Sequence, residues 1–363
     1  MIDIKEKSKC CGCHACANIC PKHCIEMICD DEGFLYPKVD KEKCINCGLC
    51  EKICPILNKR KQKDRLTIAK ATFNKNLEVR MKSSSGGIFS LLAEYILSQN
   101  GVVFGASFDK NFKVVHTRID KVEDIDKLRT SKYVQSAIGD TYKQTKDLLN
   151  EGKTVLFTGT PCQIGGLLSY LGKDYSNLYT QDLICHGVPS PKVWEKYIKY
   201  RANIANAKVK DVSFRKKFKN KSQTSFYMAF DNGVEYKQCP HSKDPMIKLF
   251  LHNNCLRPSC HDCAFKGENR QSDITLADFW GVSLIKPSMH TKFGTSLVLI
   301  HSEKGKKLFE NIIEKTKTKE VNYKIATTFN PMMNKSAKEK NREKFMSDFK
   351  NLPFEQVVKK YGK

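Results

Sequence analysis

Two cysteine runs near the N-terminus share one spacing, C-x2-C-x2-C-x3-C, followed by proline. The runs consist of Cys10, Cys13, Cys16 and Cys20, and of Cys44, Cys47, Cys50 and Cys54. Bacterial proteins with two iron–sulfur clusters use this spacing, and the fourth cysteine of each run ligates the cluster of the other run. We therefore predict that one [4Fe–4S] cluster is held by Cys10, Cys13, Cys16 and Cys54. The other is then held by Cys44, Cys47, Cys50 and Cys20.

Structural zinc is the alternative, because zinc also binds Cys-x2-Cys pairs. Zinc needs only four thiolates in two separated pairs, so two matching runs of four favour iron–sulfur clusters. This register leaves Cys11, Cys24 and Cys29 outside both ligand sets. We interpret these three as small packed residues or free thiols.

Later cysteines could form a third site. Cys260 and Cys263 make a further Cys-x2-Cys pair, and Cys162 and Cys185 each follow a segment that we predict to be a strand. The carboxyl ends of neighbouring strands meet at one edge of an α/β sheet, so these four thiolates could hold another cubane. The spacing alone does not separate this cluster from a zinc site or packed cysteines. Cys255 is a fifth candidate ligand.

Residues 83–89, with the sequence SSSGGIF, indicate a small turn that opens a helix ending at Ser98. Free amides at a helix N-terminus bind phosphate, and glycines let the phosphate approach the backbone. An ordinary serine cap is the alternative. The segment lacks the G-x-G-x-x-G dinucleotide pattern and the P-loop lysine.

The elements that must position these residues alternate between strands and helices. We predict strands at residues 102–108, 154–158, 178–184 and 295–300, and helices at 141–150, 167–171, 191–202, 244–252 and 303–313. Residues 212–238 indicate a hairpin with a DNG turn. The expected divisions are a cluster module at 1–57, a linker at 58–66, a catalytic domain at 67–327 and a charged helical tail at 328–363.

Composition favours a reducing compartment. The 363 residues include 17 cysteines, an odd number and mostly at metal-ligand spacings, which disfavours a disulfide framework. No apolar stretch of the signal-peptide kind follows the charged N-terminus, and the longest apolar run is too short to span a bilayer. We expect a cytoplasmic protein of an anaerobe with no membrane span. The lysines behind the net charge of +24 are dispersed, so we expect a solvated surface and no specific nucleic-acid binding.

Six segments together resemble a known family. They are residues 83–89 (SSSGGIF), 130–133 (TSKY), 158–163 (TGTPCQ), 184–187 (ICHG), 260–263 (CHDC) and 273–281 (DITLADFWG). Their sequence and order are similar to the beta subunit of coenzyme F420 hydrogenases and dehydrogenases. Members of that family are flavoproteins with an iron–sulfur cluster beside the flavin. The resemblance implies an α+β fold, in which a dicluster ferredoxin module precedes a mixed α/β domain that binds FAD and a third [4Fe–4S] cluster.

The resemblance also implies residue roles. Contacts to FAD would come from Ser85, Gly86, Gly87, Lys132, Tyr133, Gln163 and Asp278. The cluster beside the flavin would be held by Cys162, Cys185, Cys260 and Cys263. Lys132 and His186 are the candidate catalytic residues.

The resemblance predicts an iron–sulfur flavoprotein oxidoreductase that passes electrons between ferredoxin-type carriers and a two-electron acceptor. That acceptor would be the deazaflavin coenzyme or another small molecule, and the protein partner would be ferredoxin or another redox protein. A homo-oligomer is compatible with the sequence. The alternative is a non-catalytic subunit that delivers electrons to a partner enzyme.

Overall fold

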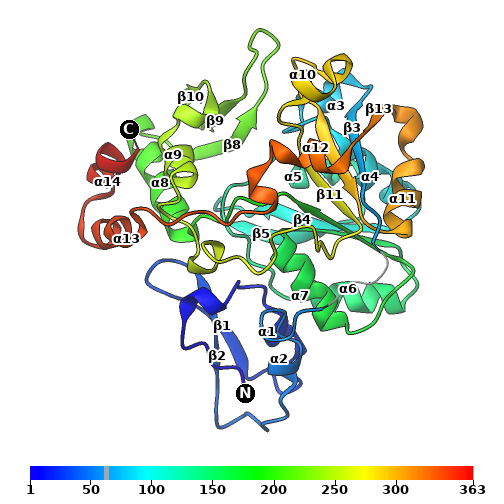
Figure 1. Ribbon diagram of the computed structural model, residues 1–363. Helices are drawn as coiled ribbons and strands as arrows, with labels where there is room; N and C mark the ends of the chain where they lie inside the picture. The colour runs from blue at the N-terminus through cyan, green and yellow to red at the C-terminus, as the bar shows by residue number, and fades with distance from the viewer. Residues whose placement is uncertain (61–64, 363) are drawn as a thin grey trace.

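The computed structural model describes residues 1–60 and 65–362 (Figure 1). Residues 61–64, which belong to the predicted linker at 58–66, lie outside the described residues. A small N-terminal module, drawn in blue, lies against a larger part built on two β-sheets (Figure 1). None of the helices in the described ranges is long and apolar enough to cross a membrane.

The N-terminal module combines one hairpin with two short helices. Strands β1 (Ile25–Cys29) and β2 (Leu35–Val39) pair antiparallel. Helix α1 (Ala15–Ile19) lies in the first cysteine run and α2 (Leu49–Lys52) in the second. Each helix follows a residue in the left-handed conformation, His14 with φ 63° and Gly48 with φ 73°. The chain therefore turns sharply inside each run, which lets successive thiols face one space.

Eight strands form the central sheet, in the order β13-β3-β12-β11-β7-β6-β4-β5. Their bounds are β3 (Ile68–Asn74), β4 (Val102–Phe108), β5 (Val114–Ile119), β6 (Val155–Thr158), β7 (Leu178–Leu183), β11 (Ile274–Asp278), β12 (Ser296–Ile300) and β13 (Thr316–Val321). Strands β4, β6, β7 and β11 run parallel, and the remaining pairs are antiparallel. Because β6 and β7 are parallel neighbours, their carboxyl ends meet at one edge of the sheet, as expected for the segments before Cys162 and Cys185.

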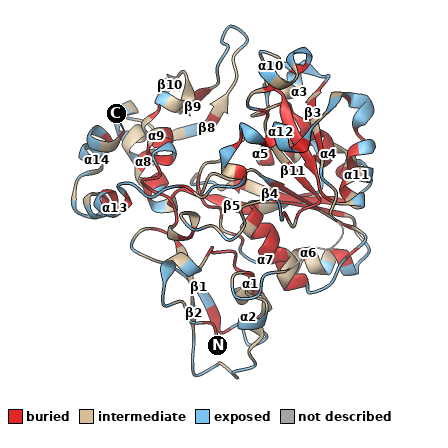
Figure 2. Cartoon of the chain, viewed as in Figure 1, coloured by how far each residue is buried: buried red, intermediate tan, exposed pale blue. Residues whose placement is uncertain are grey.

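Both faces of this sheet are buried, because apolar side chains point alternately to either side. Val103 and Leu156 face a layer made by α4 (Ile88–Ser98), α5 (Ile125–Leu128) and α11 (Glu303–Glu310). Phe104 and Phe157 face the layer of α6 (Thr141–Asn150) and α7 (Pro161–Leu171). The cysteine segment of the N-terminal module packs into this second layer, next to the buried helix α7 (Figure 2).

A smaller sheet in the order β10-β9-β8 supports a separate core. Its elements are β8 (Val209–Lys216), β9 (Ser225–Phe230), β10 (Glu235–Gln238), α8 (Pro191–Ala205), α9 (Pro245–Leu251), α13 (Arg342–Asn351) and α14 (Phe354–Tyr361). The predicted tail at 328–363 supplies α13 and α14, whose apolar residues belong to this core. The other α-helices are α3 (Leu77–Met81), α10 (Val282–Ile285) and α12 (Tyr323–Thr328). The 3-10 helices are η1 (Lys7–Lys9), η2 (Val122–Asp124), η3 (His241–Lys243), η4 (Pro258–Cys260), η5 (Pro287–Met289), η6 (Ile313–Lys315) and η7 (Pro331–Met333).

Some element boundaries differ from those that the sequence indicates. Helix α7 begins at Pro161 rather than at residue 167, because Thr160 and Gln163 form a capping box and Pro161 occupies the first turn. The helix predicted at 303–313 ends as α11 at Glu310 and continues as the separate turn η6. The predicted hairpin at 212–238 is a three-stranded sheet, because β8 also pairs with β9.

Candidate metal and cofactor centres

The first cavity lies inside the N-terminal module. Cys10, Cys13, Cys16 and Cys54 line it, together with Cys11. The first three thiols come from the segment around α1, whereas Cys54 follows α2. The structure thus brings together the four cysteines that the crossed spacing assigns to one cluster. Their role as ligands stays a prediction.

The second cavity is formed by Cys20, Cys44, Cys47 and Cys50, with Cys24 beside them. Cys20 and Cys50 are buried, but Cys47 is exposed, so this cavity reaches the protein surface. The amide of Ile2 donates to Sγ of Cys50 at 3.2 Å. The spare thiol of Cys24 lies 3.4 Å from Sγ of Cys20. Amide–sulfur bonds of this kind tune the potential of a bound cluster.

The third cavity lies between the N-terminal module and the central sheet. Cys162, Cys185, Cys260 and Cys263 line it, and Cys11 of the module lines it as well. Cys162 stands in the first turn of α7, directly after β6, and Cys185 follows β7. Cys255 lies elsewhere, fully buried in the core between the smaller sheet and α8, where its carbonyl accepts from the amide of Ser190 at 2.8 Å.

The donor set of the third cavity fits an iron–sulfur cluster. Burial raises the pKa of Cys185 to about 12 and raises the pKa of Cys260 as well, so the thiols stay protonated unless a metal replaces the proton. The basic residues that line the same cavity are Lys9, Lys59, Lys266 and Arg270. Lys266 donates to the carbonyl of Cys185, and Arg270 is 1% exposed. Within residues 1–60 and 65–362, no three His, Cys, Asp or Glu side chains are placed to hold a single metal ion. Four thiols surround a cavity instead, and nearby cations offset the negative charge of a cluster.

The serine–glycine turn lies at the N-terminus of α4. Gly87 has φ 83°, and in the described part of the chain no side chain caps this helix, so its first-turn amides lack a side-chain acceptor. Gly86 has another role. Its amide donates to Oγ of Ser296 at 2.9 Å, and a Cβ at this position would lie 2.7 Å from the carbonyl oxygen of Thr72. Gly86 is therefore needed for close packing on β3 and β12.

Asp278, at the end of β11, forms a polar cluster with Ser85. Its Oδ2 accepts from Arg215 at 2.6 Å. Burial opposes ionisation of this carboxyl, but the Arg215 charge and the Ser85 hydroxyl hold its pKa below the usual value. Lys217 donates to the carbonyls of Ser85 and Phe293, each at 2.6 Å. Burial lowers the pKa of Lys217 to about 7.

Unpartnered donors flank this cluster. In the described structure, Nε and Nη1 of Arg80 and Nε of Arg215 are buried without a hydrogen-bond partner. The carbonyl of Arg80 accepts from Lys217 at 3.0 Å, which places both arginines beside the serine–glycine turn. A buried donor without a partner is destabilising by about 1–3 kcal/mol. Bound phosphate oxygens would satisfy such donors, so this donor set fits the pyrophosphate of FAD.

Lys132, Tyr133 and Gln163 are the remaining predicted flavin contacts, and the polar groups of Gln163 are all used within the chain. Lys132 is half-buried, donates to the carbonyl of Arg129 at 3.0 Å, and has its pKa lowered to about 7 by burial. Tyr133 stacks on Phe250 with ring centres 4.7 Å apart. Gln163 is fully engaged within the chain. Its Oε1 accepts from the Thr160 amide at 2.9 Å, and its Nε2 donates to Oγ of Ser136 at 2.9 Å.

His186 lines the third cavity beside Cys185. Its Nε2 lies 2.6 Å from Oδ1 of Asn253, and burial lowers its pKa. Its ring meets Phe250 edge-on at 4.9 Å, and Tyr133 stacks on the same phenylalanine. An aromatic series therefore connects Tyr133, a predicted flavin contact, with the cysteine-lined cavity. The predicted flavin contact Tyr133 and the third cavity are thus adjacent in the fold.

Sequence reasoning missed Arg80, Arg215 and Lys217. Arg80 stands three positions before the serine–glycine turn and gave no signal beyond that position. Arg215 and Lys217 lie in the run RKKFK, which has the composition of a solvated surface strand. Only the tertiary fold brings them to Asp278 and Ser85. Trp280, two positions after Asp278, is 54% exposed and so is not a core residue.

Two family models match the chain. Residues 152–324 match the C terminus of the coenzyme F420 hydrogenase/dehydrogenase beta subunit, and residues 9–57 match the 4Fe-4S dicluster domain. Over residues 152–324 the chain is therefore similar to this beta-subunit family. The beta-subunit match includes all four cysteines of the third cavity, and the dicluster match includes both N-terminal runs. The two matches support an iron–sulfur electron-transfer subunit of oxidoreductase type.

A solved structure shares the fold of this chain. It is a chain of the F420-reducing [NiFe] hydrogenase complex from Methanosarcina barkeri, with a TM-score of 0.50 and 17% sequence identity. The alignment covers 79% of this chain and 94% of that chain. No curated protein sequence matches this chain.

Proposed function

We propose that the chain is an iron–sulfur flavoprotein that passes electrons between ferredoxin-type one-electron carriers and a two-electron acceptor through FAD. The deazaflavin coenzyme or another small molecule would be the acceptor. The proposal rests chiefly on Cys11, which lines both the first and the third cysteine cavities. A shared lining residue makes the two cavities neighbours, as an electron relay requires.

The three cavities can be ordered from the protein surface to the central sheet. The second reaches the surface at exposed Cys47, the first lies inside the module, and the third lies against the central sheet. We infer that a protein carrier exchanges electrons at the second cavity. Cys162, Cys185, Cys260 and Cys263 would hold the third cluster, and Cys255 would remain a core residue.

FAD would supply the conversion between one-electron and two-electron transfer. The free amides of α4 and the unpartnered donors of Arg80 and Arg215 would hold its phosphates. Asp278 keeps Arg215 charged and oriented for that task. Tyr133 would pack near the ring.

Lys132 and His186 are the candidate proton donors. Burial brings the pKa of Lys132 to about 7, so it can give or take a proton at neutral pH. His186 is held by Asn253 with one ring nitrogen engaged. A two-electron acceptor that also takes a proton would draw it from one of these groups.

Turnover without a partner enzyme tests the proposal. Anaerobically purified protein would be mixed with reduced ferredoxin and deazaflavin coenzyme, and both absorbances followed. We expect two ferredoxins to be oxidised for each coenzyme reduced, and no turnover in Cys185→Ala. Reduction of the clusters by ferredoxin, with no small acceptor reduced, would instead support the non-catalytic electron-transfer subunit.

A further inference from the structure

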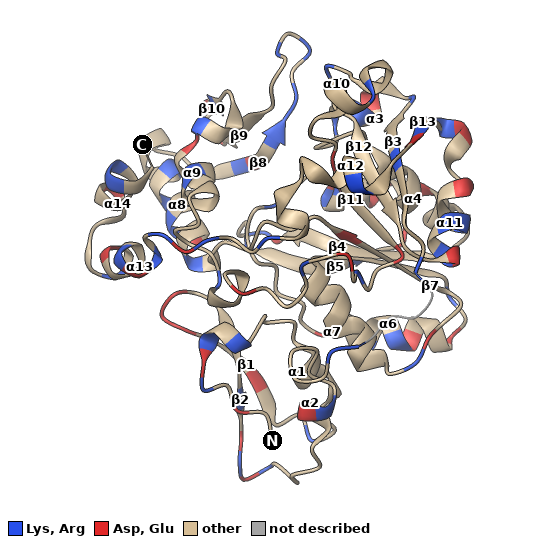
Figure 3. Cartoon of the chain, in the orientation of Figure 1, with Lys and Arg blue, Asp and Glu red and all other residues tan. Residues whose placement is uncertain are grey.

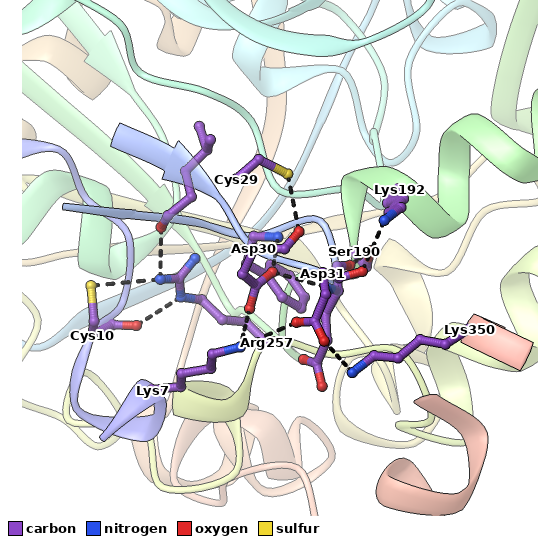
Figure 4. Close-up of polar contacts among 12 residues, drawn as sticks. Lys7, Cys10, Cys29, Asp30, Asp31, Ser190, Lys192, Arg257 and Lys350 are labelled. Carbon is purple, nitrogen blue, oxygen red and sulfur yellow. Dashed lines mark hydrogen bonds and ion pairs between the residues drawn. The ribbon is translucent and has the colours of Figure 1, made fainter. Parts of the chain in front are cut away.

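Arg257 connects the N-terminal module to the larger part of the chain. It directly precedes η4, the turn that carries Cys260, and its side chain is 0% exposed. Its Nε donates to the carbonyl of Cys10 at 2.7 Å, and its Nη2 lies 3.5 Å from Sγ of Cys10 (Figure 4). Nη2 also donates to the carbonyl of Leu35 at 3.0 Å. One guanidinium thus reaches a cysteine of the first cavity from a different part of the fold.

The surrounding chain is shaped to admit this guanidinium. Gly12 has φ 67°, and a Cβ there would lie 2.6 Å from Nη1 of Arg257. Gln135 accepts from Nη1 at 2.9 Å and in turn donates to the carbonyl of Cys11 at 3.0 Å. The ring of Tyr36 stacks 4.2 Å from the guanidinium carbon. The orientation of Arg257 toward the cysteine loop is therefore fixed from several sides.

Arg257 differs from the other buried arginines in lacking a carboxylate. Arg129, Arg270 and Arg342 form ion pairs with Asp126, Asp182 and Glu32, respectively. Among the described residues, Arg257 bonds only to carbonyls, an amide oxygen and a cysteine sulfur. A buried charge without an opposite charge is strongly destabilising. The negative charge that is missing here is the one that a cluster and its thiolates would carry in the adjoining cavity.

We propose that Arg257 raises the reduction potential of the cluster predicted at Cys10, Cys13, Cys16 and Cys54. The inference rests on the dicluster part of the proposed function and does not require the flavin. The cluster takes one electron from a reduced ferredoxin-type carrier, which is oxidised by one electron, and no bond forms or breaks. The cluster gains one negative charge in this step, and a fixed cation beside Cys10 stabilises the more negative form.

Potentiometric titration followed by EPR tests this proposal on the anaerobically purified full chain. In Arg257→Met, we expect the reduced-to-oxidised ratio of this cluster to fall about tenfold at a fixed potential, from the loss of one charge-assisted hydrogen bond. For a one-electron couple this corresponds to a shift of about 59 mV to lower potential. Arg257→Lys keeps the charge and should restore most of the shift. The signal that disappears in Cys54→Ala identifies the cluster concerned.

Arg342→Met is the matched control. Arg342 is also buried and also reaches the module, but it contacts Glu32 and Leu256 instead of a cysteine. We expect it to weaken docking of the module without moving the potential. If Arg257→Met does not retain iron, Arg257→Gln removes the charge and keeps hydrogen-bonding capacity. Equal potentials in wild type and the neutral variants, or equal shifts in Arg257→Met and Arg342→Met, would overturn the proposal. Absence of FAD would leave this result unaffected and would count only against the flavin assignment.

Discussion

Cys185 and Cys255 illustrate how the surroundings of a residue separate chemistry from packing. Cys185 follows a sheet strand and lines a cavity with four other cysteines, Lys266 and Arg270. Cys255 is 0% exposed among aromatic and aliphatic side chains of the smaller core. Burial raises the pKa of both thiols to about 12, so acidity does not distinguish them. The two residues differ in their neighbours, because other cysteines line the cavity of Cys185 and apolar side chains surround Cys255.

Replacing each cysteine by alanine gives a direct comparison. We expect Cys185→Ala to lower the iron content by about four atoms per chain, because a cubane loses one of its four ligands. Cys255→Ala should retain the wild-type iron content and lose a modest amount of stability, about 1 kcal/mol for a small buried side chain. Iron analysis and thermal unfolding check both variants. Loss of iron from Cys255→Ala alone would reverse the assignment.

His116 predicts an acid-sensitive contribution to stability. It is buried, with its ring nitrogens 2.9 Å from the Thr158 carbonyl oxygen and from Oγ of Ser136, and burial lowers its pKa to about 4. The unfolded chain, with an ordinary histidine pKa near 6.5, binds more protons in this range. Stability should therefore fall by about 2 kcal/mol as the pH drops from 7 to 5.

Denaturant unfolding of wild type and His116→Gln at both pH values measures this contribution. The variant should be less stable at pH 7 but should lose less stability on acidification. Exposed His252→Gln is the control and should behave as wild type. An identical pH dependence in His116→Gln and wild type would show that His116 does not titrate in this way.

At the scale of elements, the C-terminal helices complete a core. Phe345 and Phe349 of α13 and Val357 of α14 belong to the same cluster as Trp194 of α8. Lys350 of α13 forms an ion pair with Asp31 of the module, and Lys192 donates to the carbonyl of Asp31 at 3.1 Å (Figure 4). The end of the chain therefore holds both the smaller sheet and the acidic turn of the module.

Truncating a phenylalanine in α13 tests this role. Phe345→Ala should cost about 3–5 kcal/mol, because its side chain is fully buried. Phe329→Ala, at a position that is 40% exposed, should cost clearly less. Thermal or denaturant unfolding compares the two. Equal losses would indicate that α13 is not part of a cooperative core.

Sequence predicted the elements whose signals are local. Strands β4, β6 and β12 are apolar runs, and the cysteine sets of the two N-terminal cavities follow from spacing alone. Strand β13 gave no signal, because TKTKEV is polar and its partner β3 lies far away in the chain. The positions of Arg215 and Arg257 also depend on long-range packing. Gln163 was expected at the flavin on the strength of a motif, but the capping box of α7 occupies its side chain.

At the scale of the molecule, the dispersed surface charge differs from the specific charged contacts that attach the N-terminal module. Lys and Arg are spread over both sheets and the outer helices in this view, so the net charge of +24 forms no single basic face here (Figure 3). The charged contacts that join the module to the rest include exposed ion pairs, such as Lys350 with Asp31, and buried ones. The buried contacts include Arg257 at Cys10 and Arg342 at Glu32. This specific docking keeps Cys11 between two cavities.

The most direct measurement of the central claim is iron and flavin per chain, on anaerobically purified protein with the flavin released by acid. We predict about twelve iron atoms and one FAD, which corresponds to three cubanes and a flavin. About eight irons without flavin would contradict the account beyond the N-terminal module. The third cavity would then hold no cluster, and the large domain would be a docking module.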